Sequence, residues 1–278
     1  EQQVIGEPSA QLPATLYLGM DGTGIPMRTE ELEGRAGKGE DGKAKTREAK
    51  LCTVWSAEER DDEGIPIRDP GSVSYSAAIE SAATPDTGEV LSDFAQRVER
   101  EARRRGFLRA RRSVVLGDGA PWIWKLSNEL FPGAIEILDR FHAKEHLSAV
   151  AKAVWGPQSD LGRHWLDKRY EELDGGLVDA LLAALQIHAD TNDEARKCVG
   201  YVQTNRSRMR YPLFRAAGLC TSTGVLEAGC RVVIGARLKR SGMHWTVRGA
   251  NAIMALRSAI LSCRFQDFWD RRTNALAS

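Results

Sequence analysis

Residues 113–139, SVVLGDGAPWIWKLSNELFPGAIEILD, decide the fold class of this chain. Apolar, β-branched runs predict short buried strands over 113–116 and 134–138, and the spacing of apolar residues between them predicts a helix over 122–130. Strands and helices that alternate at this spacing indicate crossover units. We therefore expect these two strands to be parallel neighbours in one sheet.

Upstream of this stretch, the chain has the pattern of strands separated by polar loops. Apolar runs at 15–20 and 51–55 and period-2 alternation at 73–79 predict three strands, which an antiparallel meander joins most simply. Residues 30–50 are rich in Gly, Glu and Lys, which is typical of a mobile loop. A helix that stops at Gly106 follows the meander. The predicted fold class is therefore α/β, with a mixed sheet flanked by helices.

The second half of the chain has helical periodicity. One helix is predicted over 141–154, and Trp155-Gly-Pro-Gln then marks a break. Only helical spacing follows, as far as about Leu219. The cluster Thr221-Ser-Thr-Gly224 offers N-cap residues for a helix to about Lys239, and a last apolar helix is predicted after it.

The order of these elements predicts one core with one insertion. Residues 1–155 and 220–278 are expected to form the core, and residues 156–219 an all-helical insertion. The chain starts with Glu1 rather than Met, and its first strand follows almost at once. We therefore expect the chain to be a fragment that has lost an upstream domain, which the resemblance described below implies to be a DNA-binding domain.

Composition is that of an ordinary soluble protein without membrane segments. Of its 278 residues, 42% are hydrophobic and 28% are charged, and no apolar run approaches the roughly 20 residues that cross a bilayer. Five scattered cysteines without a Cys-x-x-Cys pair are typical of reduced thiols in the cytoplasm. A zinc site of Cys198, Cys220 or Cys230 with His188 would match no common ligand spacing.

Net charge is only +1, but basic residues are unevenly distributed. Residues 203–257 contain ten Lys or Arg and a single acid, Glu227. Such a segment is either a solvated basic face or a phosphate-binding surface around a catalytic acid, and the near absence of acids favours the second. Because they alternate in a polar stretch, Arg206, Arg208 and Arg210 are candidates for phosphate contacts.

Three acids lie in contexts that suit a metal-binding carboxylate. Asp21 and Asp118 each end an apolar run and precede a glycine, which predicts a position at the sheet edge with room for a substrate. Glu227 lies near the start of a predicted helix. Mg²⁺ prefers one or two carboxylates with water and phosphate oxygens, and ligands gather beyond the carboxyl ends of parallel strands. Each acid alone is a weak signal, but their joint pattern predicts a two-ion site.

Five short segments carry a family resemblance. They are Gly19-Met-Asp-Gly-Thr23, Gly117-Asp-Gly-Ala-Pro-Trp122, Leu138-Asp-Arg-Phe-His-Ala143, Gly224-Val-Leu-Glu-Ala-Gly-Cys-Arg231 and Ser241-Gly-Met-His-Trp245. Together they resemble bacterial insertion-sequence transposases of the Kra type, which are Asp-Asp-Glu enzymes related to the Mutator-like group. The resemblance extends from about Leu16 to Ser262, and the combination is far more specific than any one segment.

The resemblance implies a ribonuclease-H-like core in which Asp21, Asp118 and Glu227 are catalytic and bind Mg²⁺, or Mn²⁺ in its place. The implied enzyme is a DNA transposase that hydrolyses phosphodiesters at transposon ends and joins the freed 3′-hydroxyl to target DNA. Double-stranded DNA is then the partner, without a role for a membrane. A homodimer or higher oligomer on DNA is the implied working form, and the cytoplasm, at the bacterial nucleoid, is the implied location.

Further residues gain roles from this resemblance. Asp139 and His142 match an Asp-x-x-His element that this group carries near its active site, which implies a supporting role. His142 equally fits a partly buried histidine that is hydrogen-bonded to Asp139 and has no catalytic part. The DNA-binding candidates are Arg206, Arg208, Arg210, Arg231, Arg237, Lys239, Arg240 and Arg248.

Two alternative functions fit parts of the sequence. Asp21-Gly-Thr-Gly24 is similar to the phosphate-binding turn of actin-like ATPases and sugar kinases, but a second glycine-rich loop and a second similar half are missing from the sequence. The chain also fits an inactive, DNA-binding derivative of a transposase. The presence of all three acids weighs against loss of the site, whereas the expected lack of an upstream domain weighs for it.

Overall fold

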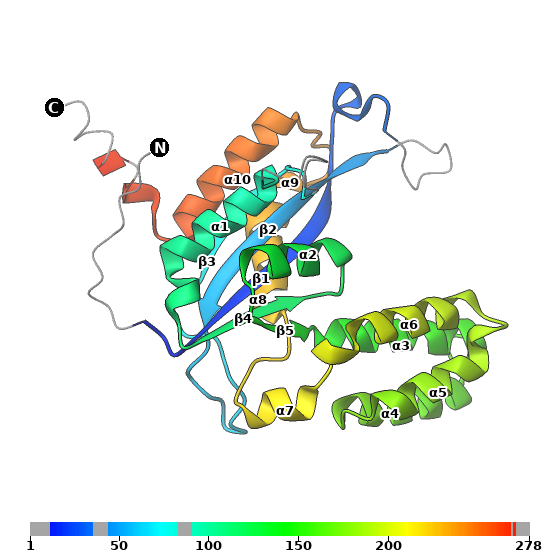
Figure 1. Ribbon diagram of the computed structural model, residues 1–278. Coiled ribbons are helices and arrows are strands. Elements are labelled where there is room, and N and C mark those ends of the chain that lie inside the picture. Colours follow the sequence, from blue (N-terminus) through cyan, green and yellow to red (C-terminus); the bar gives the residue numbers. More distant parts are fainter. Residues whose placement is uncertain (1–11, 36–43, 83–90, 268, 271–278) are drawn as a thin grey trace.

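A computed structural model of the chain describes residues 12–35, 44–82, 91–267 and 269–270. A mixed five-stranded sheet forms its centre, in the order β3-β2-β1-β4-β5 (Figure 1). The strands are β1 (Thr15–Pro26), β2 (Thr46–Ser56), β3 (Ser74–Ala78), β4 (Arg112–Gly117) and β5 (Ile135–Leu138). β1, β2 and β3 form an antiparallel meander, and β4 and β5 run parallel to β1. The predicted α/β class with a mixed sheet is confirmed, and it is consistent with a ribonuclease-H-like fold.

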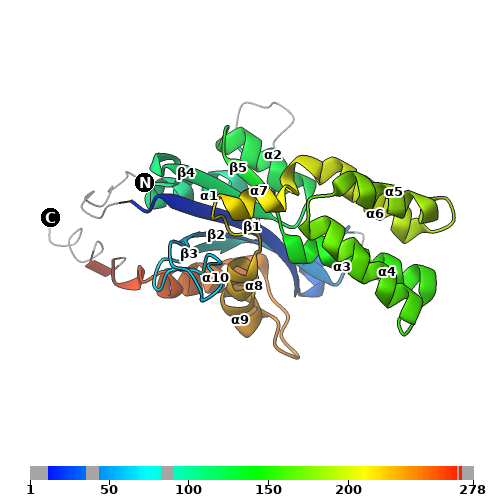
Figure 2. The same ribbon diagram turned by 90° about the horizontal axis from the view of Figure 1, so that it is seen from below.

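Helices cover both faces of the sheet (Figure 2). One face carries α1 (Asp93–Arg105) and α2 (Pro121–Leu130), whose apolar sides are buried against it. The other face carries a helical run and a final helix. These are α8 (Gly224–Gly229), the π-helical segment η4 (Cys230–Gly235), α9 (Ala236–Leu238) and α10 (Val247–Leu261). Short 3₁₀ helices occur at η1 (Thr29–Leu32), η2 (Phe107–Arg109) and η3 (Arg206–Arg208).

The remaining helices lie between β5 and α8 in the sequence, and α3 to α6 extend together to one side of the sheet (Figure 1). They are α3 (Arg140–Trp155), α4 (Asp160–Asp174), α5 (Val178–Ala189), α6 (Asp193–Asn205) and α7 (Tyr211–Ala216). We call α4, α5 and α6 the arm. Leu181 and Leu185 of the arm are fully buried in the same apolar cluster as Leu116 of β4, so the arm is packed onto the core.

The first two strands extend further than the sequence pattern indicates. β2 starts at Thr46, so the predicted loop over 30–50 is wrong for its last five residues, and residues 36–43 lie outside the described residues. The reason is that Thr46–Lys50 pairs with the second half of β1 through backbone hydrogen bonds, which do not depend on apolar side chains. No helix in the described part of the chain is long and apolar enough to cross a bilayer.

Candidate active site

The β1–β4 register brings Asp21 and Asp118 to the same level of the sheet. The parallel pairing ends with Gly19 opposite Leu116, and each aspartate lies two residues further along its own chain. Neighbouring strands are about 4.8 Å apart, and side chains two residues apart share a face. The side chain of Asp21 therefore projects from β1 next to Asp118, which directly follows the last residue of β4. Asp118 follows the last residue of β4, as predicted, whereas the prediction that Asp21 ends its strand is wrong, because β1 continues to Pro26 through pairing with β2.

Asp21 is half-buried and held by two hydrogen bonds. Its Oδ1 accepts from the Gly22 amide at 2.6 Å, and its Oδ2 accepts from the Cys230 thiol at 3.1 Å. Burial raises the pKa of Asp21, and the neighbouring Asp118 carboxylate raises it further, although the two hydrogen bonds oppose the shift. The raised pKa of Asp21 therefore reflects mainly its burial, with a smaller contribution from the charge of Asp118.

Asp118 is fixed through both its side chain and its backbone. Its Oδ1 accepts from the Ala120 amide at 2.9 Å, and its carbonyl oxygen accepts from the Tyr201 hydroxyl at 2.7 Å. Gly119 has φ +103°, which lies in the region that favours glycine. Pro121 then starts α2 with the φ angle that a first helical residue needs.

Glu227 reaches the same end of the sheet from a helix packed on one face. The Leu226 side chain packs over Gly19, where an added Cβ would lie 3.3 Å from it. An added Cβ at Gly229 would lie 2.8 Å from the Tyr75 ring, so a glycine allows this close approach of α8 to the sheet. Cys230, which contacts Asp21, is three residues after Glu227 and therefore on a neighbouring part of the same helical face.

Electrostatics places Glu227 among other acids. The side chain is exposed, but partial desolvation and the negative charges of Asp139, Glu145 and Asp21 raise its pKa. The charge of a protonated His142 opposes the shift at both Glu227 and Asp21. These interactions show that the three predicted acids occupy one region of the molecule.

Asp139 joins the end of β5 to the segment that precedes α8. It is 1% exposed and caps α3, where its Oδ1 accepts from the amides of Phe141 and His142 at 2.6 and 2.9 Å. Its Oδ2 accepts from the Thr223 amide at 2.6 Å and from the Thr223 hydroxyl. Asp139 therefore fixes the residue before α8, the helix that carries Glu227, and supports the site through the backbone.

His142 contacts a neighbouring acid and a second histidine. Its Nδ1 lies 3.2 Å from Glu145 Oε2, and its ring centroid lies 5.1 Å from that of His146. The hydrogen bond to Asp139 comes from the backbone amide of His142, so the imidazole remains available at the surface beside the acids.

A divalent cation fits the pair of aspartates better than the set of three acids. Two half-buried carboxylates on adjacent strands offer the hard oxygen ligands that Mg²⁺ prefers. Within the described residues, however, no three His, Cys, Asp or Glu side chains are close enough together to hold one ion. Glu227 is therefore near the pair without forming a ready-made ligand set with it. The same finding leaves the described cysteines and histidines without a zinc site.

Comparison with protein families identifies the chain at the level of family. The model of an uncharacterised protein family, UPF0236, matches residues 83–266. This chain belongs to that family. The matched region contains Asp118, Asp139, Glu227 and the whole arm, whereas Asp21 lies before it. A search of curated proteins gave no match.

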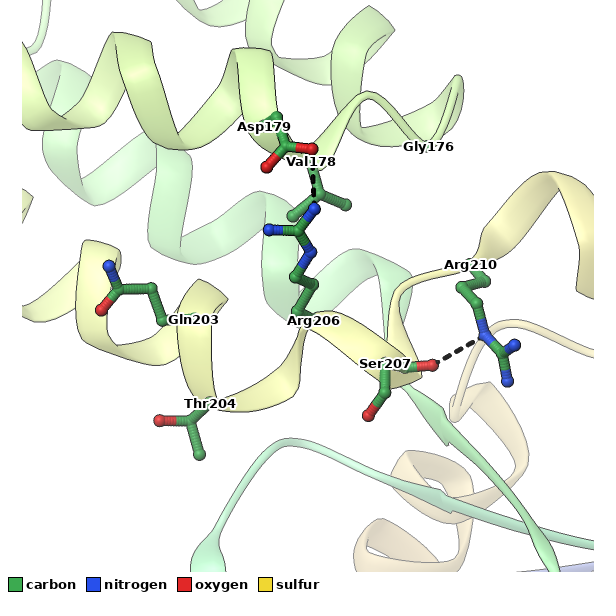
Figure 3. A pocket seen from close by; sticks show the side chains of 8 residues that line it. All are labelled: Gly176, Val178, Asp179, Gln203, Thr204, Arg206, Ser207 and Arg210. Atoms are coloured by element: carbon green, nitrogen blue, oxygen red, sulfur yellow. Dashed lines mark hydrogen bonds and ion pairs between the residues drawn. The ribbon is translucent and has the colours of Figure 1, made fainter.

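The basic candidates of η3, Arg206 and Arg208, already have partners. Arg206 forms an ion pair with Asp179 at 2.6 Å, and its guanidinium points toward that acid at a pocket of about 470 Å³ (Figure 3). Arg208 pairs with Glu136 at 2.6 Å and stacks 4.4 Å from the centroid of the Trp124 ring. Both arginines therefore have structural contacts that the basic run in the sequence does not reveal.

Arg210 also lines this pocket and donates from Nε to the Ser207 carbonyl at 3.0 Å (Figure 3). The pocket lies between the start of α5 and the end of α6. Its lining residues are Gly176, Val178, Asp179, Gln203, Thr204, Arg206, Ser207 and Arg210. None of the three acids, and no supporting residue named above, belongs to it, so it is separate from the carboxylate site.

The basic candidates of the α8–α10 face are different. We call Arg231, Lys239, Arg240 and Arg248 the site-side basic group. All four are exposed, and within the described residues none of them forms an ion pair with a carboxylate. Lys239 Nζ contacts the Thr23 hydroxyl, two residues after Asp21 on β1. Arg237 is half-buried over the Trp245 ring and packs rather than faces solvent.

Three contacts at the site have little or no signal in the sequence. Cys230 is the easiest to find, because it follows Glu227 by three residues in a predicted helix. Thr223 could be recognised only as an N-cap candidate, although its hydroxyl donates to Asp139 rather than capping α8. Tyr201 has no local signal, because it meets Asp118 only after the arm has folded.

Proposed function

We propose that this chain is the catalytic part of a Mg²⁺-dependent DNA transposase, which hydrolyses phosphodiesters at transposon ends and performs strand transfer. The observation that carries the proposal is the placement of Asp21 and Asp118 at one level of two parallel strands, with Glu227 in the same electrostatic environment. Strand transfer and transposon ends rest on the resemblance to Kra-type transposases. Assembly as a dimer or higher oligomer on DNA, at the bacterial nucleoid, belongs to the same proposal.

The lack of cationic partners for the three acids supports a bound cation at this site. Within the described residues, Asp21, Asp118 and Glu227 form no ion pair with Lys or Arg, and the pKa values of Asp21 and Glu227 are raised. Asp21 and Asp118 would hold Mg²⁺, with Mn²⁺ as a substitute. Such an ion would supply charge neutralisation at the scissile phosphate and a more acidic attacking hydroxyl or water.

Glu227 is the third carboxylate of the proposed site. Its helix is fixed by Asp139 through Thr223 and by the close contact of Gly229 with the sheet, whereas its side chain is exposed. The backbone position is therefore set, and the side chain is free to approach the aspartates. In this proposal Glu227 helps to orient the attacking hydroxyl and the scissile phosphate.

The site-side basic group supports a nucleic-acid substrate. Exposed cations without carboxylate partners attract the phosphate backbone, and binding releases counterions from DNA. Arg231 follows directly after Cys230, which contacts Asp21, and Lys239 contacts Thr23. DNA bound by this group would therefore lie along the surface that carries the acids.

The alternative of an actin-like ATPase or sugar kinase depended on a phosphate-binding turn at Asp21-Gly-Thr-Gly24. In the structure these four residues are extended strand, with Gly22 opposite Lys50 and Gly24 opposite Glu48. The Glu48 carboxylate also covers the position above Gly22. An acid over an extended strand is unfavourable for a bound phosphate, because the Glu48 carboxylate would repel it.

Asp118→Asn tests the proposed function. The amide retains an acceptor for the Ala120 N–H, so the fold and the salt-sensitive binding of DNA should persist. Nicking of supercoiled plasmid with Mg²⁺ or Mn²⁺ should fall at least about a hundredfold, because a bound ion contributes several kcal/mol to such reactions. Asp193→Asn is the matched control, since it removes an exposed acid of α6 that already pairs with Arg196.

Undiminished nicking by Asp118→Asn would exclude the site. DNA binding by the wild-type chain without any metal-dependent nicking would instead favour the inactive, DNA-binding derivative.

A further inference from the structure

Tyr201 of α6 is the contact between the arm and the carboxylate site. Its hydroxyl donates to the Asp118 carbonyl oxygen at 2.7 Å, across 83 residues of sequence. This hydrogen bond joins α6 of the arm directly to the backbone of a proposed ion ligand.

The loop that follows Asp118 is shaped around the Tyr201 ring. An added Cβ at Gly119 would lie only 2.5 Å from Tyr201 Cε2, a distance that real Cβ contacts do not reach. The positive φ of Gly119 already favours glycine. Two separate constraints therefore keep this position small, and both let the loop pack directly on the tyrosine.

The other side of the ring is held by α3. The ring centroids of Tyr201 and His146 are 4.0 Å apart, with 32° between the ring planes. His146 is half-buried, and burial lowers its pKa, which favours the neutral imidazole as the stacking partner. Tyr201 is therefore enclosed between α3 and the Asp118 loop and has little freedom to move.

We propose that Tyr201 is a positioning residue that holds Asp118 beside Asp21 and thereby links the arm to the cation site. The inference rests on the proposed function, because positioning matters only if the two aspartates bind an ion. Displacement of α6 would be transmitted to the backbone of Asp118 through this hydrogen bond. The arm would then influence the affinity of the site for its ion.

Tyr201→Phe removes the hydroxyl and keeps the ring that stacks on His146. The readout is the rise in melting temperature with Mn²⁺, which measures ion binding without catalysis. We expect Tyr201→Phe to need about fivefold more Mn²⁺ than the wild type for the same rise, because one hydrogen bond contributes about 1 kcal/mol.

Tyr170→Phe is the matched control. Tyr170 is also an arm tyrosine whose hydroxyl donates to a backbone carbonyl, that of Lys144, at 3.3 Å. It contacts none of the acids of the site, so its Mn²⁺ requirement should equal that of the wild type. Asp118→Asn should show no rise with Mn²⁺.

The outcomes separate this inference from the proposed function. A wild-type Mn²⁺ requirement in Tyr201→Phe, together with loss of the response in Asp118→Asn, would overturn the positioning role alone. If Asp118→Asn responds to Mn²⁺ like the wild type, the cation site itself is wrong.

Hydrogen exchange of the metal-free protein provides a second measurement. Amides 117–120 should exchange faster in Tyr201→Phe than in Tyr170→Phe, because the loop has lost its anchor. Equal exchange in the two variants would overturn the positioning role regardless of metal binding.

Discussion

The arm differs in the pairing of its charges from the end of the sheet at Asp21, Asp118 and Glu227, which we call the carboxylate end. In the arm, acids and bases neutralise one another, mostly along single helices. The pairs are Arg163–Asp160, Arg169–Glu172, Arg196–Asp193, Lys197–Glu194 and Arg206–Asp179. At the carboxylate end, three acids and four bases occur without one ion pair between them in the described residues. Charges that are left unpaired remain available to an ion and to phosphates.

Glu227 and Arg231 show how this separation arises. They are four residues apart, the spacing at which Glu and Arg commonly pair on an α-helix. The structure shows no ion pair between these two described side chains, and the helix changes from α to π at Cys230 between them. The change of helix type at Cys230 therefore coincides with the absence of this ion pair. Such π-helical turns are frequent at functional sites.

The largest expected effect on DNA binding compares the two regions directly. Changing Arg231, Lys239 and Arg240 to Gln should lower the slope of log affinity against log salt by about 2.7, which is 0.9 for each lost phosphate contact. Affinity for double-stranded DNA at low salt should fall more than about tenfold. Fluorescence anisotropy over a salt series measures both quantities.

The matched control removes the same charge from the arm. Arg163, Arg196 and Lys197 are exposed, and each pairs with an acid three residues earlier. Changing these three to Gln should leave the salt slope nearly unchanged. If the salt slope fell as much in the arm variant as in the site-side variant, paired and unpaired charges would contribute equally to DNA binding. The proposed role of the site-side basic group would then be wrong.

The second effect concerns Asp139, the acid of this region that is neutralised by hydrogen bonds instead of by a cation. Asp139→Asn replaces one of the two carboxylate oxygens with an NH₂ group. That group must face either the α3 amides or Thr223, and in both places one donor then faces another donor. We expect a loss of about 2–3 kcal/mol in the free energy of unfolding, measured with urea at pH 7.

Asp174→Asn is the control for this comparison. Asp174 is a partly exposed acid at the end of α4 that accepts from Arg140 at 3.0 Å and Lys144 at 2.6 Å. Ion pairs of this kind contribute about 1 kcal/mol or less. A smaller loss for Asp139→Asn than for Asp174→Asn would show that the buried carboxylate does not hold α8 in place.

Much of the fold could be predicted because its signals are local. Apolar periodicity placed the five strands, and the strand–helix–strand order indicated that β4 and β5 are parallel neighbours. The extension of β2 to Thr46 could not be predicted in this way. It depends on backbone pairing with β1, to which polar residues contribute as well as apolar ones.

The basic segment shows a different limit of sequence reasoning. Counting charges over residues 203–257 found one acid, but the partners of Arg206 and Arg208 come from 27 and 72 residues away. Only the folded chain separates these paired arginines from the site-side basic group. The Tyr201–Asp118 contact has the same origin, since it joins two elements that no local pattern connects.

The smallest expected effect concerns Asp21, an acid of the site without a cationic partner. Burial and Asp118 raise its pKa, so folding makes the ionised form less favourable. A carboxyl whose pKa is raised in the folded state contributes stability at pH values below its unfolded pKa. That contribution is lost as pH rises through the folded pKa. At pH 7, the metal-free protein therefore carries the cost of the ionised Asp21.

Asp21→Asn removes this cost, and its Oδ1 still accepts from the Gly22 amide, while the NH₂ group that replaces Oδ2 faces the Cys230 sulfur, a weak acceptor. The metal-free variant should be slightly more stable than the wild type at pH 7 and should have a shallower dependence of stability on pH above the unfolded pKa of Asp. Urea unfolding at several pH values in the presence of a chelator measures both. Asp139→Asn should shift stability in the opposite direction. A loss of stability in Asp21→Asn would mean that this carboxylate serves the fold, as Asp139 does, and is not kept for an ion.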